Sequence, residues 1–443
     1  MKKAKSSILH EGNISYVVPF ILITSCFALW GFANDITNPM VKAFSKIFRM
    51  SVTEGTLVQV AFYGGYFAMA FPAAMFIRKY TYKAGVMLGL GLYAFGAFLF
   101  YPAMLSGMYF PFLIAYFILT CGLSFLETSS NPYILSMGSE ETATRRLNLA
   151  QAFNPIGSLL GMYVAMNFIQ NRLHPMDTAE RALLDQAEFE AIRDADLQVL
   201  IGPYVLIGLV ILVMLIVIRL AKMPVNKDQN HNIDFIPTLK RIFQRKHYRE
   251  GVITQFFYVG AQIMCWTFII QYGTHLFTTH MGMEEQAAEV LSQKYNIAAM
   301  ALFCVSRFVC TFLLRYLNAG NLLKLLAVAA CVFTAGVILF QNIWGMYCLV
   351  AVSGCMSLMF PTIYGIALER LGDDAKFGAA GLIMAILGGS VLPPLQAAII
   401  DMGSIGGFPA VNLSFILPFI CYVIVIIYGQ RTYMRWKKAQ KRG

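Results

Sequence analysis

The chain contains twelve long apolar runs, and these constrain its fold more than any other feature of the sequence. A helix of about 20 residues spans the roughly 30 Å hydrocarbon core of a bilayer, because each residue adds about 1.5 Å. The runs lie near residues 16–42, 54–77, 84–105, 109–137, 147–170, 199–221, 250–277, 288–314, 321–341, 344–369, 376–401 and 410–434. We therefore expect an all-α membrane protein with twelve transmembrane helices.

The composition agrees with a membrane protein. Of the 443 residues, 58% are hydrophobic and 13% are charged, which is too apolar for an ordinary soluble domain. The net charge of +11 does not indicate a nucleic-acid partner, because the basic residues lie in short loops between apolar runs and not on one soluble face. We expect membrane lipid around the protein and no nucleic acid.

The sequence offers no pattern for a metal, a cofactor or an enzymatic reaction. The nine cysteines fall inside or beside apolar runs without metal-ligand spacing, and His275 and His280 are too loosely spaced for a metal pair. There is no GxxxxGK[ST] loop, no HExxH motif and no Ser/His/Asp pattern. We therefore expect that the protein uses no cofactor, does not use ATP directly and is not an enzyme.

Lys and Arg concentrate in alternate loops, which predicts the orientation in the membrane. If the N-terminus is cytoplasmic, the inner side collects most of the basic residues, including the 219–249 cluster and the tail from Arg431 to Arg442. The outer side then keeps Lys42, Lys46, Arg49, Arg172, Arg181, Arg193 and Lys294. Both termini are therefore predicted to be cytoplasmic.

The basic segment 222–249 separates two sets of six runs. A repeat with an offset of roughly 230 residues relates them, because the fifth run passes through Gly157-Ser158 and the eleventh through Gly388-Gly389-Ser390. We predict an N-terminal six-helix half at 1–221, a cytoplasmic linker at 222–249 and a C-terminal six-helix half with a short basic tail at 250–443. Glycines four residues apart, such as Gly85 and Gly89 or Gly157 and Gly161, predict close helix packing.

Three formal charges fall clearly within the runs: Asp35, Glu127 and Arg307. A charge at mid-bilayer costs on the order of 2.5–3.5 kcal/mol on insertion scales, so such groups usually face a polar cavity, an ion path or a partner. Desolvated carboxylates bind and release protons near neutral pH, which makes Asp35 and Glu127 the candidate proton-coupling residues. Two alternatives stay open: Glu127 hydrogen-bonds a neighbouring helix for assembly, or Asp35 is solvated near the interface, where Pro39 breaks the helix.

Polar stripes on two runs suggest a sugar site. The candidates are Asn148, Gln151 and Asn154 on the fifth run and Gln255, Tyr258, Gln262 and Trp266 on the seventh. Steps of three and four residues place each set on one helix face. Amides bond sugar hydroxyls, an aromatic ring covers the apolar sugar face, and Arg307 adds a fork of donors. The alternatives are amides that join helices to one another, an Arg307 that pairs with an acid, and an Arg307 that extends to the membrane interface.

Several motifs resemble the fucose–galactose–glucose–proton symporters of the major facilitator superfamily over nearly the whole chain. They are Asn34-Asp35-Ile36 with Pro39, Ala61-Phe62-Tyr63-Gly64-Gly65-Tyr66-Phe67, Leu126-Glu127-Thr128 with Asn131-Pro132, the run Arg146 to Asn154, Tyr258-Val259-Gly260-Ala261-Gln262 with Cys265-Trp266, and Pro361-Thr362-Ile363. The Gly-Ala-Gln and Cys-Trp elements of the seventh run resemble the fucose branch.

The resemblance implies a secondary transporter of two six-helix halves that imports L-fucose with a proton by alternating access through an outward-opening cavity. Asp35 and Glu127 would be the protonatable pair. In place of a leucine and an asparagine that often precede Asn34-Asp35 in the family, this chain has Phe32-Ala33, and Asn38 is a candidate to replace the lost polar contact. The expected substrate-binding residues are Asn38, Glu127, Gln151, Asn154, Tyr258, Gln262, Trp266 and Arg307.

We also expect a monomer in the plasma membrane, which is the inner membrane of a bacterium. The partners expected are a small-molecule sugar, protons and lipid. A D-galactose or D-glucose proton symporter is the alternative within the class. A non-transporting sugar sensor on the same fold is the alternative outside it, although such a sensor usually needs a signalling appendage and the tails here are too short to fold as domains.

Overall fold

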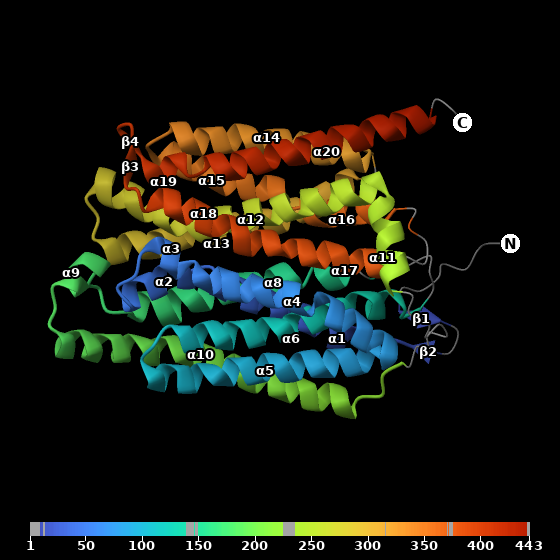
Figure 1. Cartoon of the computed structure of the whole chain (residues 1–443), viewed down its shortest axis with the longest axis horizontal. Helices are drawn as coiled ribbons and strands as arrows, with labels where there is room; N and C mark the ends of the chain where they lie inside the picture. Colours follow the sequence, from blue (N-terminus) through green and yellow to red (C-terminus); the bar gives the residue numbers. More distant parts are fainter. Residues whose placement is uncertain are drawn as a thin grey trace.

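The computed structural model is a bundle of long helices that run roughly along one axis (Figure 1). It describes residues 9–11, 14–138, 146, 149–224, 235–314, 316–369, 371 and 375–440. Two short antiparallel strand pairs occur, β1 (His10–Glu11) with β2 (Ile14–Ser15) and β3 (Ser404–Ile405) with β4 (Phe408–Pro409). All the other regular elements described are helices.

The N-terminal group of helices extends to residue 220. Its members are α1 (Val17–Thr37), α2 (Met40–Ile47), α3 (Val52–Gly55), α4 (Leu57–Lys79), α5 (Tyr82–Ser106), α6 (Phe110–Leu135), α8 (Asn154–Val164), the π-helix η1 (Ala165–Ile169), the 3₁₀ helix η2 (Gln170–Arg172), α9 (Thr178–Ala182) and α10 (Gln186–Leu220). In this group α5 packs against α6 and α10, and α1 against α8.

The C-terminal group follows α11 (Phe235–Gln244), which lies within the predicted linker. Its members are α12 (Lys246–Met281), α13 (Glu285–Leu313), α14 (Ala319–Leu339), α15 (Ile343–Met356), α16 (Met359–Leu368), α17 (Ala375–Met384), the 3₁₀ helix η4 (Ala385–Leu387), α18 (Gly388–Ile400), α19 (Ala410–Leu413) and α20 (Ile416–Gln440). Here α12 packs against α13, α18 and α20, and α14 packs against α15 and α20.

Eleven stretches of helix among the described residues are long and apolar enough to cross a membrane. Helix α13, with 29 residues, packs alongside α12 and α15 and supplies the twelfth crossing. The prediction of an all-α protein with twelve transmembrane helices is therefore confirmed.

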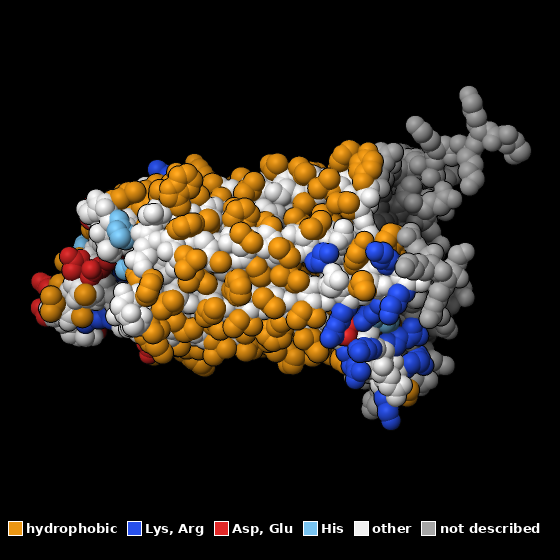
Figure 2. Space-filling model, turned by 90° about the horizontal axis from the view of Figure 1, so that it is seen from above, with side chains coloured by type: hydrophobic (Ala, Val, Ile, Leu, Met, Phe, Trp, Pro, Cys, Tyr) orange, Lys and Arg blue, Asp and Glu red, His pale blue; other side chains and the backbone are white. Residues whose placement is uncertain are grey.

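The two ends of the bundle differ in charge, as Figure 2 shows. Lys and Arg gather at the end that carries α11, β1, β2 and the last turns of α20, called here the α11 end. Acidic side chains gather at the opposite end, called here the α9 end, which carries α2, α3, α9, β3 and β4. A belt of hydrophobic side chains covers the surface between the two ends, as expected for a lipid-facing surface.

Two helices differ in length from the expected runs. The first run stops early, because α1 ends at Thr37 and α2 starts only at Met40, after Pro39. The sixth run extends well before residue 199, because α10 starts at Gln186, where the side chain of Asp185 accepts a hydrogen bond from the backbone of Glu188. Part of the acidic segment between the fifth and sixth runs is therefore helical.

Glycines allow close helix contacts in both groups. A Cβ added to Gly157 on α8 would lie 1.8 Å from the carbonyl oxygen of Ala28 on α1. A Cβ added to Gly388 on α18 would lie 1.9 Å from the carbonyl oxygen of Phe256 on α12. The two contacts join the fifth run to the first and the eleventh to the seventh, so they are related by the sequence repeat. The predicted close packing at Gly85, Gly89, Gly157 and Gly161 is confirmed, because an added Cβ at each would lie within 3.0 Å of another helix.

Candidate substrate and proton site

A cavity of about 130 Å³ lies between the N-terminal and C-terminal groups of helices. It has room for on the order of ten waters, and a monosaccharide has a comparable number of non-hydrogen atoms. Its lining combines aromatic rings, amides and ionisable groups. The lining residues are Phe27, Trp30, Asn34, Asp35, Tyr63, Tyr66, Glu127, Gln151, Asn154, Ser158, Val259, Gln262, Ile263, Trp266, Met300, Phe303, Arg307, Phe360, Pro361 and Ile386.

Asp35 reaches the cavity from the last turn of α1. Its side chain is 3% exposed, and its Oδ1 accepts a hydrogen bond from Asn38 Nδ2 at 2.9 Å. Helix α8 packs tightly on the same part of α1, where Ser158 Oγ donates to the carbonyl of Gly31 at 3.4 Å. The alternative in which Asp35 is solvated near an interface does not fit this burial.

Glu127 enters the cavity from α6 beside a row of amides. Asn131, one turn further along α6, donates through Nδ2 to the Glu127 carbonyl at 3.1 Å and accepts from Gln151 Nε2 at 3.3 Å. Asn154 donates through Nδ2 to the carbonyl of Phe27 at 3.3 Å. Among the described residues, no ion pair joins Asp35 or Glu127 to a basic side chain. Both carboxyl groups therefore face the cavity without a fixed cation.

The C-terminal helices contribute a cation and a tryptophan. Arg307 on α13 donates through Nε to the Ser357 carbonyl at 3.2 Å, and its guanidinium lies 4.7 Å from the centre of the Phe303 ring. Trp266 on α12 donates through Nε1 to Ser353 Oγ at 3.1 Å. The indole nitrogen is therefore held within the protein, and the ring contributes an apolar surface to the cavity. Gln262 lies one turn before Trp266 and also lines the cavity.

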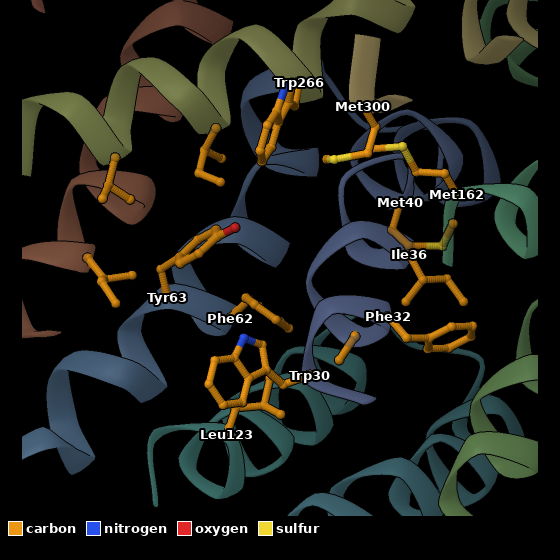
Figure 3. Packing of buried hydrophobic residues seen from close by; sticks show 14 of the residues in the cluster. Trp30, Phe32, Ile36, Met40, Phe62, Tyr63, Leu123, Met162, Trp266 and Met300 are labelled. Carbon is orange, nitrogen blue, oxygen red and sulfur yellow. The ribbon is translucent and has the colours of Figure 1, made fainter. Parts of the chain in front are cut away.

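Aromatic residues that sequence reasoning did not select complete the lining. In the view of Figure 3, the ring of Tyr63 lies between Trp266 and Trp30. The Tyr63 hydroxyl and Asn34 Oδ1 are buried and have no hydrogen-bond partner among the described residues. Tyr63 and Tyr66 belong to a motif that the family resemblance had singled out, but an aromatic residue in an apolar run gives no separate sign that it faces a cavity.

Three residues expected at the site do not line the cavity. Asn38 is 1% exposed and lies beyond Asp35, toward the α9 end. Tyr258 is fully buried, and its hydroxyl donates to the carbonyl of Met356 at 2.9 Å. Gln255 is also fully buried. Asn148, the first residue of the predicted stripe on the fifth run, lies outside the described residues.

Contacts between the two helix groups close the cavity toward the α9 end. Lys42 Nζ on α2 lies 2.8 Å from Glu285 Oε1 and 3.5 Å from Glu289 Oε1 on α13. The Asp401 carboxylate, after α18, accepts hydrogen bonds from the backbone amides of Val52 and Thr53 at 3.0 and 2.8 Å. We call these two sets of contacts the α9-end latch.

Comparison with known proteins decides the family. Residues 23–393 match the model of the Major Facilitator Superfamily. The chain belongs to this superfamily. The L-fucose-proton symporter of Haemophilus influenzae is 52% identical to it over 95% of this chain and 97% of that protein. The glucose/galactose transporter of Brucella abortus is 30% identical over 92% of each chain.

A solved structure of this superfamily shares the fold. The transporter FucP in the outward conformation is 30% identical over 94% of this chain and 99% of that chain, with a TM-score of 0.74. A variant of the E. coli fucose:proton symporter FucP has the same identity and TM-score over 95% of this chain. The predicted major facilitator fold is therefore confirmed. These relatives are transporters and not enzymes.

Proposed function

We propose that this chain imports L-fucose together with a proton by alternating access. The observation that carries the proposal is a cavity in which two carboxyl groups, with no ion pair among the described residues, lie beside amides, aromatic rings and Arg307. The high identity to an L-fucose-proton symporter over nearly the whole chain supports the choice of sugar.

The polar groups of the cavity suit a neutral sugar. The Tyr63 hydroxyl and Asn34 Oδ1 lack a partner in the described structure, so a bound sugar can satisfy them with its hydroxyls. The Trp266 ring would cover an apolar C–H face of the sugar. We assign sugar contacts to Glu127, Gln151, Asn154, Gln262, Trp266 and Arg307, which line the cavity, and add Asn34 and Tyr63 to them.

Asp35 and Glu127 are the proposed proton-coupling residues. Moving one positive charge inward is worth about 2.3 kcal/mol per 100 mV, and a pH gradient adds to this. Coupling requires that proton and sugar each bind more tightly when the other is bound. A Glu127 carboxyl that binds the sugar well only when it carries the proton would provide such reciprocity.

We assign the α11 end to the cytoplasm of a bacterial inner membrane, because Lys and Arg gather there. Both termini are then cytoplasmic, the halves are 1–221 and 250–443, and a monomer surrounded by lipid carries the complete site. In this orientation the α9 end faces outward and is closed. The outward-opening cavity implied by the family resemblance is therefore not the state described here.

Uptake of labelled L-fucose into proteoliposomes tests the assignment. With the liposome interior made alkaline, we expect L-fucose to accumulate, and we expect a protonophore to reduce the accumulation to equilibration. Unlabelled L-fucose should compete more strongly than D-galactose or D-glucose. Equal accumulation with and without the protonophore would contradict proton coupling.

The same assay separates the alternatives. The Brucella abortus relative favours a D-galactose or D-glucose symporter as the second candidate, and stronger competition by those sugars would support it. A sugar sensor would bind the labelled sugar without carrying it into the liposomes.

A further inference from the structure

Asn38 links the candidate proton site to a helix of the opposite group. Its Nδ2 donates to Asp35 Oδ1 at 2.9 Å. Its Oδ1 accepts from Gln59 Nε2 at 3.2 Å and from Thr267 Oγ1 at 3.4 Å, and Gln59 Nε2 also donates to Thr267 Oγ1 at 3.1 Å. A chain of hydrogen bonds therefore runs from Asp35 on α1, through α4, to α12.

All four side chains are buried. Asp35 is 3% exposed, Asn38 is 1% exposed, and Gln59 and Thr267 are fully buried. Hydrogen bonds gain strength in such an interior, and a buried polar group that loses its partner is costly. Because both ends of the Asn38 amide are engaged, its orientation depends on the groups on both sides.

We propose that Asn38 is a positioning residue that makes closure of the α9 end depend on the charge of Asp35. The proposal rests on the proposed function, in which Asp35 carries a proton. An ionised carboxylate accepts a charge-assisted hydrogen bond about twice as strong as a neutral one. Ionised Asp35 therefore holds the amide with Oδ1 turned toward Gln59 and Thr267, which joins the two groups of helices.

A proton on Asp35 changes this balance. The carboxyl group loses its charge and gains an O–H donor, which the Asn38 amide oxygen can accept and the amide nitrogen cannot. Turning the Asn38 amide to meet that donor would bring Nδ2 against Gln59 Nε2, so the Gln59 amide must turn as well, which leaves its nitrogen in place of its oxygen without a partner. Protonated Asp35 thus weakens the link to α12. A carrier that holds a proton but no sugar therefore closes its α9 end less readily, whereas a bound sugar would contact both groups of helices across the cavity and restore closure. This difference limits proton leak.

Other titratable or charged groups face the same region. Tyr63 and Tyr66 on α4, Glu127 on α6 and Arg307 on α13 line the cavity with Asp35. Lys42 and Lys46 on α2 and Glu285 and Glu289 on α13 lie at the α9 end. The test therefore compares variants at one imposed gradient.

The test measures proton leak without sugar, together with exchange of labelled L-fucose, in proteoliposomes. The first variant is Asn38→Leu, which removes both the amide donor and the amide acceptor. The second is Thr267→Val, which removes one hydroxyl at nearly constant volume. Asn167→Leu is the matched control, because Asn167 donates to the Tyr163 carbonyl in its own helix at 3.0 Å. We expect Asn38→Leu and Thr267→Val each to raise the ratio of proton leak to sugar exchange by about three- to tenfold. This is the effect expected from the loss of one or two hydrogen bonds. The control should match the wild type.

Asp35→Asn completes the comparison. Adding Asn38→Leu to Asp35→Asn should cause no further proton leak, because the side chain at position 35 then cannot bind or release a proton and Asn38 has no change of charge to respond to. If Asn38→Leu and Thr267→Val exchange sugar and leak no more than the wild type, the proposal is wrong. It is also wrong if Asn38→Leu weakens L-fucose binding without a leak, because Asn38 would then be a sugar ligand. Wild-type protein that exchanges no L-fucose would instead contradict the proposed function.

Discussion

Two buried tyrosines allow a contact with the sugar to be distinguished from a contact within the protein core. The Tyr63 hydroxyl faces the cavity without a partner in the described structure, whereas the Tyr258 hydroxyl donates to the Met356 carbonyl. We expect Tyr63→Phe to weaken L-fucose binding by about three- to tenfold and to leave stability unchanged. Tyr258→Phe should lower the free energy of unfolding by about 1 kcal/mol and leave binding unchanged. Titration calorimetry measures L-fucose affinity, and thermal unfolding in detergent measures stability. Unchanged L-fucose binding in Tyr63→Phe would show that the Tyr63 hydroxyl does not contact the sugar.

Glu127 provides a second test at the scale of one residue. Glu127→Gln keeps the shape of the side chain but cannot exchange a proton. We expect this variant to exchange labelled L-fucose across the membrane but to lose its accumulation against a gradient. Glu190→Gln, an exposed position on α10, is the matched control and should accumulate sugar normally. Accumulation by Glu127→Gln in the presence of a proton gradient would exclude the role given to this acid.

Sequence reasoning located the residues whose chemistry is unusual for a membrane. Asp35, Glu127 and Arg307 stood out because charge is rare in apolar runs, and all three line the cavity. Tyr63 did not stand out, because a ring in an apolar run can equally face lipid or core. Asn38 was predicted at the sugar site. The helix break before Pro39 instead directs its side chain toward α4 and α12.

At the scale of helices, Gly157 and Gly388 test the packing repeat. An added methyl group at either position would lie less than 2 Å from a backbone carbonyl of the neighbouring helix, and backbone cannot move aside cheaply. We expect Gly157→Ala and Gly388→Ala each to destabilise the protein by about 1–3 kcal/mol. Gly202→Ala on α10, where no atom lies within 4 Å of the added Cβ, is the control. Thermal unfolding that is unchanged in the first two variants would contradict these close helix contacts.

The α9-end latch makes a prediction about conformation. Lys42→Gln removes the charge that pairs with Glu285 and Glu289 across the two helix groups. We expect backbone amides of residues 40–56 and 285–296 to exchange hydrogen for deuterium faster, because the closed end opens more often. Arg193→Gln, which breaks a pair with the adjacent Asp194, is the control. Equal exchange in both variants would show that the pair does not hold the end closed.

The apolar runs predicted which segments cross the membrane but not where every helix ends. Helix α10 continues beyond the apolar run because its polar first turns project past the hydrophobic belt, and Asp185 caps them. Short helices such as α2, α3 and α9 escaped prediction because no long apolar run marks them. Their positions depend on contacts with distant segments, such as Asp401 with α3.

At the scale of the whole molecule, the conformational state could not be predicted from the sequence. A transporter must populate states open at either end, and these differ by only a few kcal/mol. One sequence encodes both of these states. The family resemblance implied an outward-opening cavity, whereas the α9 end is closed in this structure. The separation of basic and acidic ends, in contrast, follows from composition and is visible in Figure 2.

In the proposed mechanism, L-fucose and a proton enter the cell together. The most direct test records the pH of lightly buffered medium around energy-depleted cells that express the protein, after L-fucose, D-galactose or D-glucose is added. We predict that the medium becomes more alkaline with L-fucose, and that the change is lost in Asp35→Asn and Glu127→Gln. No change of pH with L-fucose, in cells shown to carry the protein in their membrane, would contradict proton symport of L-fucose.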